Sequence, residues 1–364
     1  MERYINPDIF IFFDNGEFCL WNYRDDKHYI LDKEYVLHLL DVARDVNAAD
    51  HPSDADFFEA GVFLSAPPHK AEWGWGKISH MFHVGTKNAV WKPDDPTASY
   101  VEAYLNDCQE RYADIEDHGY RTTRTDGEFV ALPSPELDAI ASINLWEALK
   151  NRKTTRTFFD EPIFLQSLAT ILYCTFGEIQ NPWERLESLG VQGVGTRKTS
   201  PAAGAVHSTD AYVIAMNVDG LAPGVYFYQC DKHHLIKLSD VQYRPIVSSL
   251  LAGQDFAASA SALIVAVSRF DRLWKKYDHS RIYRACLLDI GHLSQTFHLL
   301  ANSTGLNSWQ TAAFSDDDFA RILKLRPDIE DPMFVLALGR GNGDSLHPSM
   351  LESLIRRRAE ELGV

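Results

Sequence analysis

The sequence has few cysteines and no apolar run long enough to cross a membrane. Its five cysteines are scattered without a Cys-x-x-Cys pair, which argues against a zinc site, an iron–sulfur cluster or a disulfide framework. The opening MERYINPDIF lacks the basic region and apolar core of a signal peptide, and no later stretch approaches the roughly 20 apolar residues of a membrane span. We therefore expect a soluble, cytoplasmic protein with no metal site and no membrane association.

Positive charge is also in short supply. The chain has 35 Lys and Arg against 51 Asp and Glu, which gives a formal net charge of −16. Binding to nucleic acid relies on clustered Lys and Arg that contact phosphates. We therefore expect no nucleic-acid partner, although a local basic pocket would still suit a small anion.

The length of the chain predicts more than one structural unit. At 364 residues it exceeds what one hydrophobic core usually covers. The stretch DHGYRTTRTDGEFVALPSP, residues 117–135, loses helical periodicity and ends in proline-flanked polar residues, as a linker or surface excursion does. We therefore predict two domains, residues 1–125 and residues 126–364.

The first domain begins with a predicted β-hairpin. The stretch IFIFFDNGEFCLWNY has apolar and aromatic runs on both sides of Asn15-Gly16, a pair that tolerates the positive φ angles of a tight turn. A short helix is expected from its cap at Ser53 to its stop near Gly61. Before it, LDKEYVLHLLDVA predicts a helix capped by Asp32, with an apolar stripe of Tyr35, Val36, Leu39, Leu40 and Ala43.

The second domain alternates predicted helices and strands, which implies an α+β or α/β layer fold. Helices are predicted in INLWEALK, FLQSLATILYCTFG, IYRACLLDIGHLSQTFHLLANSTG and SDDDFARILKL, and strands in AYVIAMNV, GVYFYQC, ALIVAV and MFVLALG. The long third helix is apolar around much of its circumference, as burial between two layers or two subunits requires. Its apolar residues are Leu287, Ile290, Leu293, Phe297, Leu300 and Ala301.

A group of cations follows the first of these helices. In ALKNRKTTRTFFDEP, the residues Arg152, Lys153, Thr154 and Arg156 crowd into five positions. Guanidinium groups can clamp phosphate oxygens bidentately, so the group suits a phosphate, but a solvated basic helix end explains it as well. Arg340, in LALGRGNGD, follows a predicted strand end, where ligands gather; taken alone, it is better explained as an ordinary surface residue.

A stretch with small side chains precedes the strand AYVIAMNV. The segment SPAAGAVH runs from Ser200 to His207. Small residues let the backbone approach a flat ligand closely, whereas the alternative is a loop that merely packs tightly. His207, taken alone, is better explained as a structural histidine.

Two further stretches could carry chemistry. In SRFDRLWKKYDHSRIYR, Lys276 and Tyr277 precede the long helix; an ammonium beside a tyrosine favours the phenolate and would give a general base, while the alternative is an exposed amphipathic turn. In GLNSWQTAAFSDDDFARIL, Ser315 with Asp318 three residues on predicts a helix cap. The residues before that cap, Thr311, Ala312 and Ala313, have no role that the pattern decides.

Taken in order, these pieces resemble the nitroreductase-like flavoproteins, and more narrowly the SagB/McbC-type dehydrogenases that oxidise azolines in ribosomally made peptides. The resemblance runs from Ile143 to Arg340. The family's Arg-x-Ser-x-Arg flavin motif appears as Arg152, Thr154 and Arg156, and its Ser-Pro-Ser-Ala-Gly-Ala-Leu-His segment appears as SPAAGAVH. Further matching stretches are GVYFY, WKKY, YR, LLDIGHLSQ, GLNSWQTAAF and the LGR that contains Gly339 and Arg340.

The resemblance implies a homodimer of α+β subunits, each with a mainly antiparallel sheet flanked by helices, and FMN at the interface. In this reading Lys276 and Tyr277 are the catalytic pair, which takes a proton from the peptide ring while hydride passes to the flavin. Arg152, Lys153, Thr154, Arg156 and Arg340 would hold the phosphate and ribityl end. The remaining cofactor-binding residues would be Ser200, Pro201, Ala202, Ala203, Gly204, Thr311, Ala312, Ala313 and Gly339.

The sequence departs from the family pattern at three places. WKKY has one residue more than the family's Trp-Lys-Tyr, so Lys275 could take the place given to Lys276. Ala312 stands where glycine is usual, and Ser208 follows His207 where proline is usual. These differences bear on the substrate more than on the cofactor.

Residues 1–125 resemble the small winged-helix-like elements that bind the leaders of precursor peptides by adding them as a strand to a sheet edge. A structural cap over the flavin domain is an equal alternative. The resemblance therefore implies an FMN-dependent dehydrogenase that converts thiazoline or oxazoline rings of a precursor peptide to thiazole or oxazole, with a cyclodehydratase as partner. The alternatives are oxidation of another peptide side chain, NAD(P)H-dependent reduction of a nitro compound or quinone, and a scaffold that binds a leader peptide.

Overall fold

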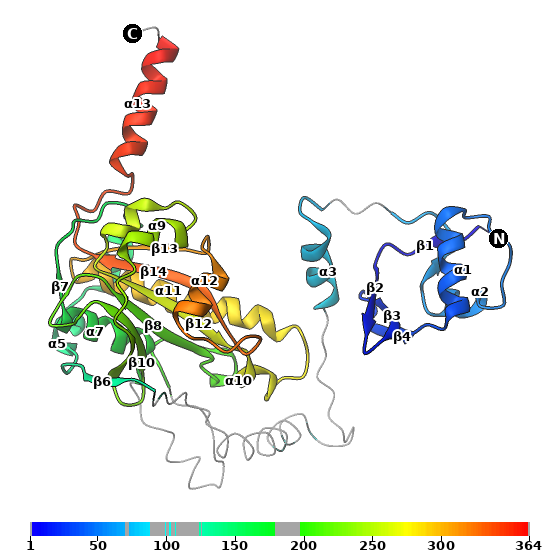
Figure 1. Cartoon of the computed structure of the whole chain (residues 1–364), viewed down its shortest axis with the longest axis horizontal. Coiled ribbons are helices and arrows are strands. Elements are labelled where there is room, and N and C mark those ends of the chain that lie inside the picture. Colours follow the sequence, from blue (N-terminus) through cyan, green and yellow to red (C-terminus); the bar gives the residue numbers. More distant parts are fainter. Residues whose placement is uncertain are drawn as a thin grey trace. The chain divides into compact units, whose positions relative to one another are not determined.

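The structure is a computed structural model that describes residues 2–69, 73–87, 99, 102, 106, 124, 126–178 and 197–362. Its internal contacts divide the chain into two compact units, Met1–Trp91 and Lys92–Val364 (Figure 1). The predicted domain boundary at residue 125 falls on a position outside the described residues, so it stays a prediction.

The N-terminal unit contains the predicted hairpin. Strands β2 (Ile9–Asp14) and β3 (Glu17–Asn22) pair antiparallel. Asn15 and Gly16 between them have φ of 48° and 87°, as a two-residue turn with positive φ at both positions requires. Strand β4 (Lys27–Ile30) completes a three-stranded sheet, and β1 (Tyr4–Ile5) pairs separately with β5 (Phe63–Leu64).

Helices α1 (Lys33–Arg44), α2 (Asp54–Glu59) and α3 (Lys77–Gly85) belong to this unit. Asp32 and Ser53 take the N-cap positions, but neither side chain bonds to its helix backbone. The predicted stripe of α1 is wrong on one side, because Leu40 is 50% exposed while His38 is buried. The His38 imidazole bonds to Asp54 at 2.6 Å, which turns the face of α1 that carries it toward α2.

The second unit is built on a seven-stranded sheet in the order β13-β14-β12-β8-β10-β11-β6. Every neighbouring pair is antiparallel, so the predicted α+β fold with a mainly antiparallel sheet is confirmed. The strands are β6 (Glu128–Ala131), β8 (Thr209–Ala215), β10 (Gly224–Gln229), β11 (His234–Ser239), β12 (Ala262–Arg269), β13 (Asn307–Thr311) and β14 (Glu330–Gly339). The short β7 (Ile163–Phe164) and β9 (Val218–Asp219) form a separate parallel pair.

Strand β6 corrects the linker prediction for residues 117–135. It lies inside that stretch and pairs with β11, so that Phe129 faces Ile236. A four-residue edge strand whose Phe129 is 59% exposed has no alternating apolar pattern to reveal it. Residues 117–123 and 125 lie outside the described residues.

The helices of this unit follow the predicted positions. The predicted ones are α6 (Leu145–Asn151), α7 (Leu165–Phe176), α11 (Ile282–Ser303) and α12 (Asp316–Ile322). Ser315 takes the N-cap of α12, but its hydroxyl donates to the Asp318 carboxylate at 2.7 Å and not to the helix backbone. The sequence did not predict α5 (Leu137–Ala141), α9 (Val247–Leu250), α10 (Phe270–Trp274) or α13 (Pro348–Leu362).

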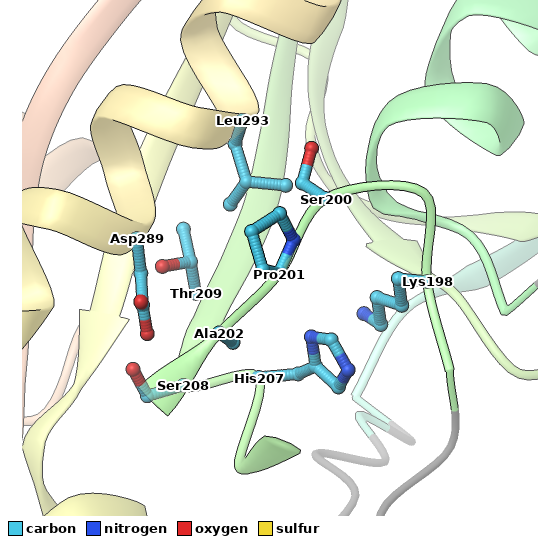
Figure 2. Close-up of a pocket in the computed structure, with 9 residues that line it drawn as sticks. All are labelled: Lys198, Ser200, Pro201, Ala202, His207, Ser208, Thr209, Asp289 and Leu293. Carbon is cyan, nitrogen blue, oxygen red and sulfur yellow. The ribbon is translucent and has the colours of Figure 1, made fainter. Parts of the chain in front are cut away.

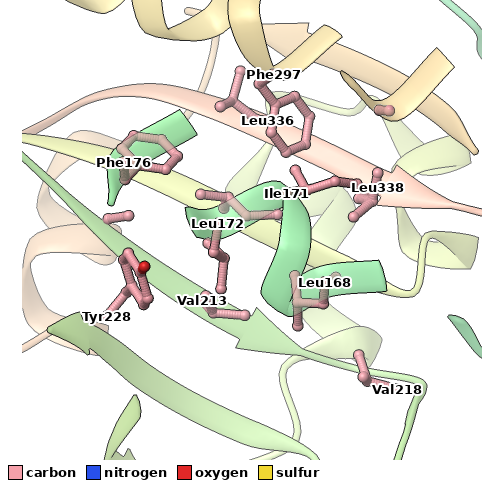
Figure 3. Packing of buried hydrophobic residues seen from close by; sticks show 14 of the residues in the cluster. Leu168, Ile171, Leu172, Phe176, Val213, Val218, Tyr228, Phe297, Leu336 and Leu338 are labelled. Atoms are coloured by element: carbon pink, nitrogen blue, oxygen red, sulfur yellow. The ribbon is translucent and has the colours of Figure 1, made fainter. Parts of the chain in front are cut away.

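Alternate residues of the sheet fill two cores. Val213 of β8 and Leu336 of β14 face α7 and α11, where they meet Leu172 and Phe297 (Figure 3). Tyr212 and the other residues of opposite parity face a second cluster that includes residues of α9 and α12. Helix α11 therefore packs across one face of the sheet, and residues along its length can reach the loops at the sheet ends.

Candidate functional site

Lys276 and Tyr277 follow α10 and lie against Gly204 of the small-residue segment. Lys276 is 6% exposed, and its Nζ donates to the carbonyl oxygen of Gly204 at 3.0 Å. A Cβ atom built on Gly204 would lie 2.2 Å from the Tyr277 hydroxyl oxygen and 2.7 Å from Lys276 Nζ. Lys275 is exposed. The structure thus joins two predicted pieces that are distant in sequence, and it favours Lys276 over Lys275 for the role that the resemblance implies.

The small-residue segment is conformationally unusual. Gly204, Ala205 and His207 have φ of 54°, 58° and 48°, in the left-handed region that costs a non-glycine residue about 1–2 kcal/mol. Such backbone persists when its surroundings hold it in place. Arg272 does so at one end, because its guanidinium donates to the His207 carbonyl at 3.1 Å. That same guanidinium is anchored by two bonds to the buried Asp210 carboxylate, at 2.9 and 3.1 Å.

Helix α11 holds the other end of the segment. Both carboxylate oxygens of Asp289 accept from the Ala203 amide, at 3.1 and 3.2 Å. The Ser200 hydroxyl lies 2.7 Å from the hydroxyl of Thr296, which is about two turns further along the helix than Asp289. Figure 2 shows Asp289 reaching from α11 toward the segment, on the side where Ala202, Ser208 and Thr209 line a small pocket. Burial raises the pKa of Asp289.

The cation segment after α6 lies against the C-terminal part of α11 and the start of β13. The Lys153 amide donates to the Asn302 side chain at 2.9 Å, and the Thr155 amide donates to the Ser308 carbonyl at 3.0 Å. The Ser308 hydroxyl is bonded in turn to Asn302 at 2.8 Å and to His298 at 2.6 Å. One helix therefore supports both the cation segment and the small-residue segment.

The cations of the first segment have no acidic partner among the residues that the structure describes. The Arg156 guanidinium donates to the Ser345 carbonyl at 2.9 Å, a neutral partner. Within the residues that the structure describes, Arg152, Lys153, Arg156 and Arg340 form no ion pair. In a chain of net charge −16, a partly exposed group of unpaired cations is suited to an anion.

The other predicted cofactor residues are held by their own neighbours. The Arg340 guanidinium donates to the Pro162 carbonyl at 2.9 Å and lies 5.5 Å from the Phe164 ring centroid. A Cβ on Gly339 would lie 3.0 Å from Phe158 and from the Ser261 amide. Thr311 is the last residue of β13. Ala313 follows the strand, and its carbonyl oxygen accepts a hydrogen bond from the Gln254 side chain at 2.9 Å. Ala312 and Ala313 are exposed.

His298 is a buried residue of this region that sequence reasoning missed. It is 1% exposed, and burial, assisted by the Arg152 charge, lowers its pKa to about 4. The imidazole is therefore neutral near pH 7 and accepts or donates one hydrogen bond with Ser308.

Sequence reasoning gave the supporting residues Asp289, Asn302, Arg272 and His298 no role, although Asp289 lies in the matching stretch LLDIGHLSQ. A signal was present for Asp289 alone, since a carboxylate within the apolar pattern of a long helix needs a partner. In the residues that the structure describes, no His, Cys, Asp and Glu side chains gather in a group that could hold a metal ion. The described helices include none of the length and apolarity that a membrane span needs.

Fold and site together define an α+β protein with an antiparallel sheet, a cationic segment and a small-residue segment braced by one helix. The chain belongs to the nitroreductase family, whose model matches residues 149–340. Members of this family generally bind a flavin. The residues matched include the cation segment, the small-residue segment, the Lys276-Tyr277 pair and Arg340.

Two proteins are similar to this chain in sequence. A Methanocaldococcus jannaschii protein, whose name places it among the nitroreductases, is 27% identical over 56% of this chain and 95% of its own length. The trifolitoxin operon protein TfxC of Rhizobium leguminosarum bv. trifolii is 24% identical over 59% of this chain. The chain spans 60% of the length of TfxC.

Solved structures are similar at low overall superposition scores. A protein from Ralstonia eutropha, titled as a nitroreductase, is 24% identical and covers 61% of this chain and 93% of its own, with a TM-score of 0.46. A chain of the E. coli microcin synthetase McbBCD complex with truncated pro-MccB17 bound is 18% identical. It covers 86% of this chain and 98% of its own, with a TM-score of 0.44.

Proposed function

We propose that this protein is an FMN-dependent dehydrogenase that oxidises azoline rings in a ribosomally made peptide to azoles. The observation that carries the proposal is the meeting of Lys276 and Tyr277 at Gly204, where the Lys276 ammonium is 3.0 Å from the Gly204 carbonyl. By the SagB/McbC resemblance, Lys276 and Tyr277 are the catalytic pair. The segment that they contact is the one that, by the same resemblance, lies against the flavin. Membership of the nitroreductase family supports the flavin.

The residues present fit FMN. Arg152, Lys153 and Arg156 are cations without an ion-pair partner in the described part of the chain, which suits the FMN phosphate. Gly204 is exposed and has no side chain, so a planar ring can approach its backbone. FMN held by these residues would supply the acceptor for a hydride equivalent, with oxygen as the final oxidant.

The chain's own residues would handle the proton. Oxidation of an azoline removes two hydrogens from the ring, one as a proton and one with its electron pair. We assign Tyr277 to take the proton and the Lys276 ammonium to stabilise the negative charge of the tyrosine oxygen before transfer. Because its Nζ is held by the Gly204 carbonyl, Lys276 is positioned before substrate arrives.

We further propose a precursor peptide as substrate and a cyclodehydratase as partner. The support is the motif resemblance, together with the similarity to a protein of the trifolitoxin operon. The N-terminal unit would receive the leader of this peptide. Its strand β4 is at the edge of the three-stranded sheet, beside a pocket of about 310 Å³ lined by residues of β4, α1 and α2 that include Tyr29, Tyr35 and Phe57.

A homodimer is part of the proposal. Leu145, Trp146 and Leu149 on α6 are 68%, 67% and 47% exposed, and Leu287 and Leu288 on α11 are 50% and 63% exposed. Helices α6 and α11 pack on each other. Large apolar side chains gathered on neighbouring helices are typical of a subunit interface.

The test of the cofactor compares FMN with riboflavin, which lacks the phosphate. The purified protein should be yellow, release FMN on denaturation and bind FMN more tightly than riboflavin. The double variant Arg152→Ala/Arg156→Ala should lose that preference, while Arg358→Ala, an exposed arginine of α13, should keep it. A colourless protein that cannot be reconstituted with FMN would exclude the proposed function.

The alternative is an NAD(P)H-dependent reductase of nitro compounds or quinones. The nitroreductase name of the Methanocaldococcus jannaschii relative favours it. Rapid bleaching of the flavin by NAD(P)H without oxygen, with no change in peptide mass, would establish this alternative in place of the dehydrogenase.

A further inference from the structure

The small-residue segment is held by hydrogen bonds from residues of two elements. Lys276 and Arg272, from the region of α10, hold the carbonyls of Gly204 and His207 at 3.0 and 3.1 Å. Asp289, from α11, holds the Ala203 amide. The segment between these points includes Gly204 and Ala205, both at positive φ. The conformation of the segment therefore depends on hydrogen bonds with residues of both elements.

Burial of the Asp289 carboxyl group is energetically unfavourable. Asp289 is 4% exposed, and it forms no ion pair with any residue that the structure describes. A buried carboxylate without a cation is destabilising unless hydrogen bonds compensate it. Among the residues that the structure describes, both hydrogen bonds to Asp289 come from the Ala203 amide, so the interaction that compensates Asp289 is also the one that holds the segment.

A small pocket lies beside the contact between the small-residue segment and α11. It has a volume of about 10 Å³ and is lined by Asp289 and Leu293 of α11 and by Ala202, Ser208 and Thr209 (Figure 2). The hydroxyls of Ser208 and Thr209 are buried there without a hydrogen-bond partner. With space and unsatisfied polar groups beside it, the segment could shift toward α11 if the bond to Asp289 were removed.

We propose that Asp289 is a positioning residue. Through its hydrogen bond to the Ala203 amide, it sets the distance between the Ser200–Gly204 backbone and the flavin ring. The proposal rests on the proposed function, because it concerns the position of the backbone relative to a bound flavin. Asp289 acts from behind the segment and touches neither cofactor nor substrate. Removing it should let the backbone relax away from the ring and weaken FMN binding, with the cation segment unchanged.

The test uses paired variants of the full-length protein. Asp289→Ala removes the acceptor, whereas Asp289→Asn keeps an oxygen that can accept from the Ala203 amide. Ala203→Pro removes the donor instead; Ala202 has φ −140° and ψ 155° and Ala203 begins a 3-10 turn, which is where proline and its preceding residue fit. Thr170→Val is the control. It removes a comparable hydrogen bond outside the site, in which the Thr170 hydroxyl accepts from the Glu136 amide at a distance of 3.0 Å.

The expected result is an FMN Kd raised about 10-fold or more in Asp289→Ala and in Ala203→Pro, in line with the strength of a hydrogen bond to a charged group. Asp289→Asn should restore most of the affinity, and Thr170→Val should leave it unchanged. Normal affinity in both Asp289→Ala and Ala203→Pro, or an equal loss in Thr170→Val, would overturn the proposal.

A second readout separates this proposal from the proposed function. Hydrogen exchange at the Ala203 amide can be followed in the protein without added FMN. Protection that is lost in Asp289→Ala and kept in Asp289→Asn supports the positioning role, and unchanged protection in Asp289→Ala refutes it. Failure of the wild-type protein to bind FMN would instead refute the proposed function.

Discussion

Replacing Gly204 by alanine is the sharpest perturbation of the candidate site. The backbone cost is limited, because an alanine at φ 54° loses about 1–2 kcal/mol. The steric cost falls on function, since the new Cβ would lie 2.2 Å from the Tyr277 hydroxyl and 2.7 Å from Lys276 Nζ. Both groups end flexible side chains, so they can move aside without unfolding the protein. We expect Gly204→Ala to fold and to lose most of its activity.

The size of the loss can be bounded. A displacement of about 1 Å in a catalytic group can lower the rate by about 10²-fold, and losing general-base catalysis costs about 10²–10⁴-fold. The assay is the rate at which a cyclised peptide loses two hydrogens, followed by mass spectrometry, with urea unfolding measured in parallel. The control is Gly220→Ala, at φ 86° with its nearest contact, Leu165, at 3.6 Å. If Gly204→Ala were as active as Gly220→Ala, the placement of Lys276 and Tyr277 would be wrong.

Three further predictions test other parts of the account. Lys276→Ala should lower the rate of ring oxidation by about 10²-fold or more, while Lys275→Ala, at an exposed side chain, should retain it; the reverse order in the mass-spectrometric assay would transfer the role to Lys275. The folded-state pKa of His298 is lowered to about 4, below its value near 6.5 in an unfolded chain, so its contribution to stability is present above pH 6.5 and is lost as the pH falls toward 4. Wild-type protein should therefore lose about 1 kcal/mol more than His298→Gln in urea unfolding between about pH 7 and pH 5.5, and equal losses would contradict the neutral, buried imidazole. Leu288→Asp, at a side chain 63% exposed on α11, should convert the proposed dimer to monomers in sedimentation analysis, while Leu37→Asp on α1, 51% exposed, should not; a dimer that survives Leu288→Asp would place the interface elsewhere.

The long, strongly patterned elements were predictable from sequence. Strands β8 and β12 are buried along their whole length and contain the apolar runs AYVIA and ALIVAV, and α11 has apolar residues at helical spacing over 22 residues. The strands β6, β11 and β13 were missed because their patterns are short or mixed: β13 reads NSWQT, and its Asn307 and Ser308 are buried through bonds to other segments. Tertiary contacts, which a single sequence does not display, decide such elements.

The candidate site also contains residues that the sequence indicated and residues whose role it did not indicate. The cation segment and the small-residue segment carry recognisable residue types, such as Arg152 with Arg156 and the small residues before Gly204. The residues that brace them do so through backbone atoms, as Asp289 does at Ala203 and Asn302 at Lys153. A hydrogen bond to a backbone group does not constrain the side chain of the residue that carries this group, so the sequence pattern indicated the segments but not the residues that hold them.

The most direct test of the central claim is a single turnover without oxygen. Protein loaded with FMN is mixed with an azoline-containing peptide, and flavin absorbance and peptide mass are followed together. The account predicts that the flavin bleaches as the peptide loses two hydrogens, one flavin reduced for each ring oxidised, and that Lys276→Ala with bound FMN does neither at a comparable rate. A flavin that stays oxidised in the presence of the peptide but bleaches with NAD(P)H would contradict the dehydrogenase and identify a reductase.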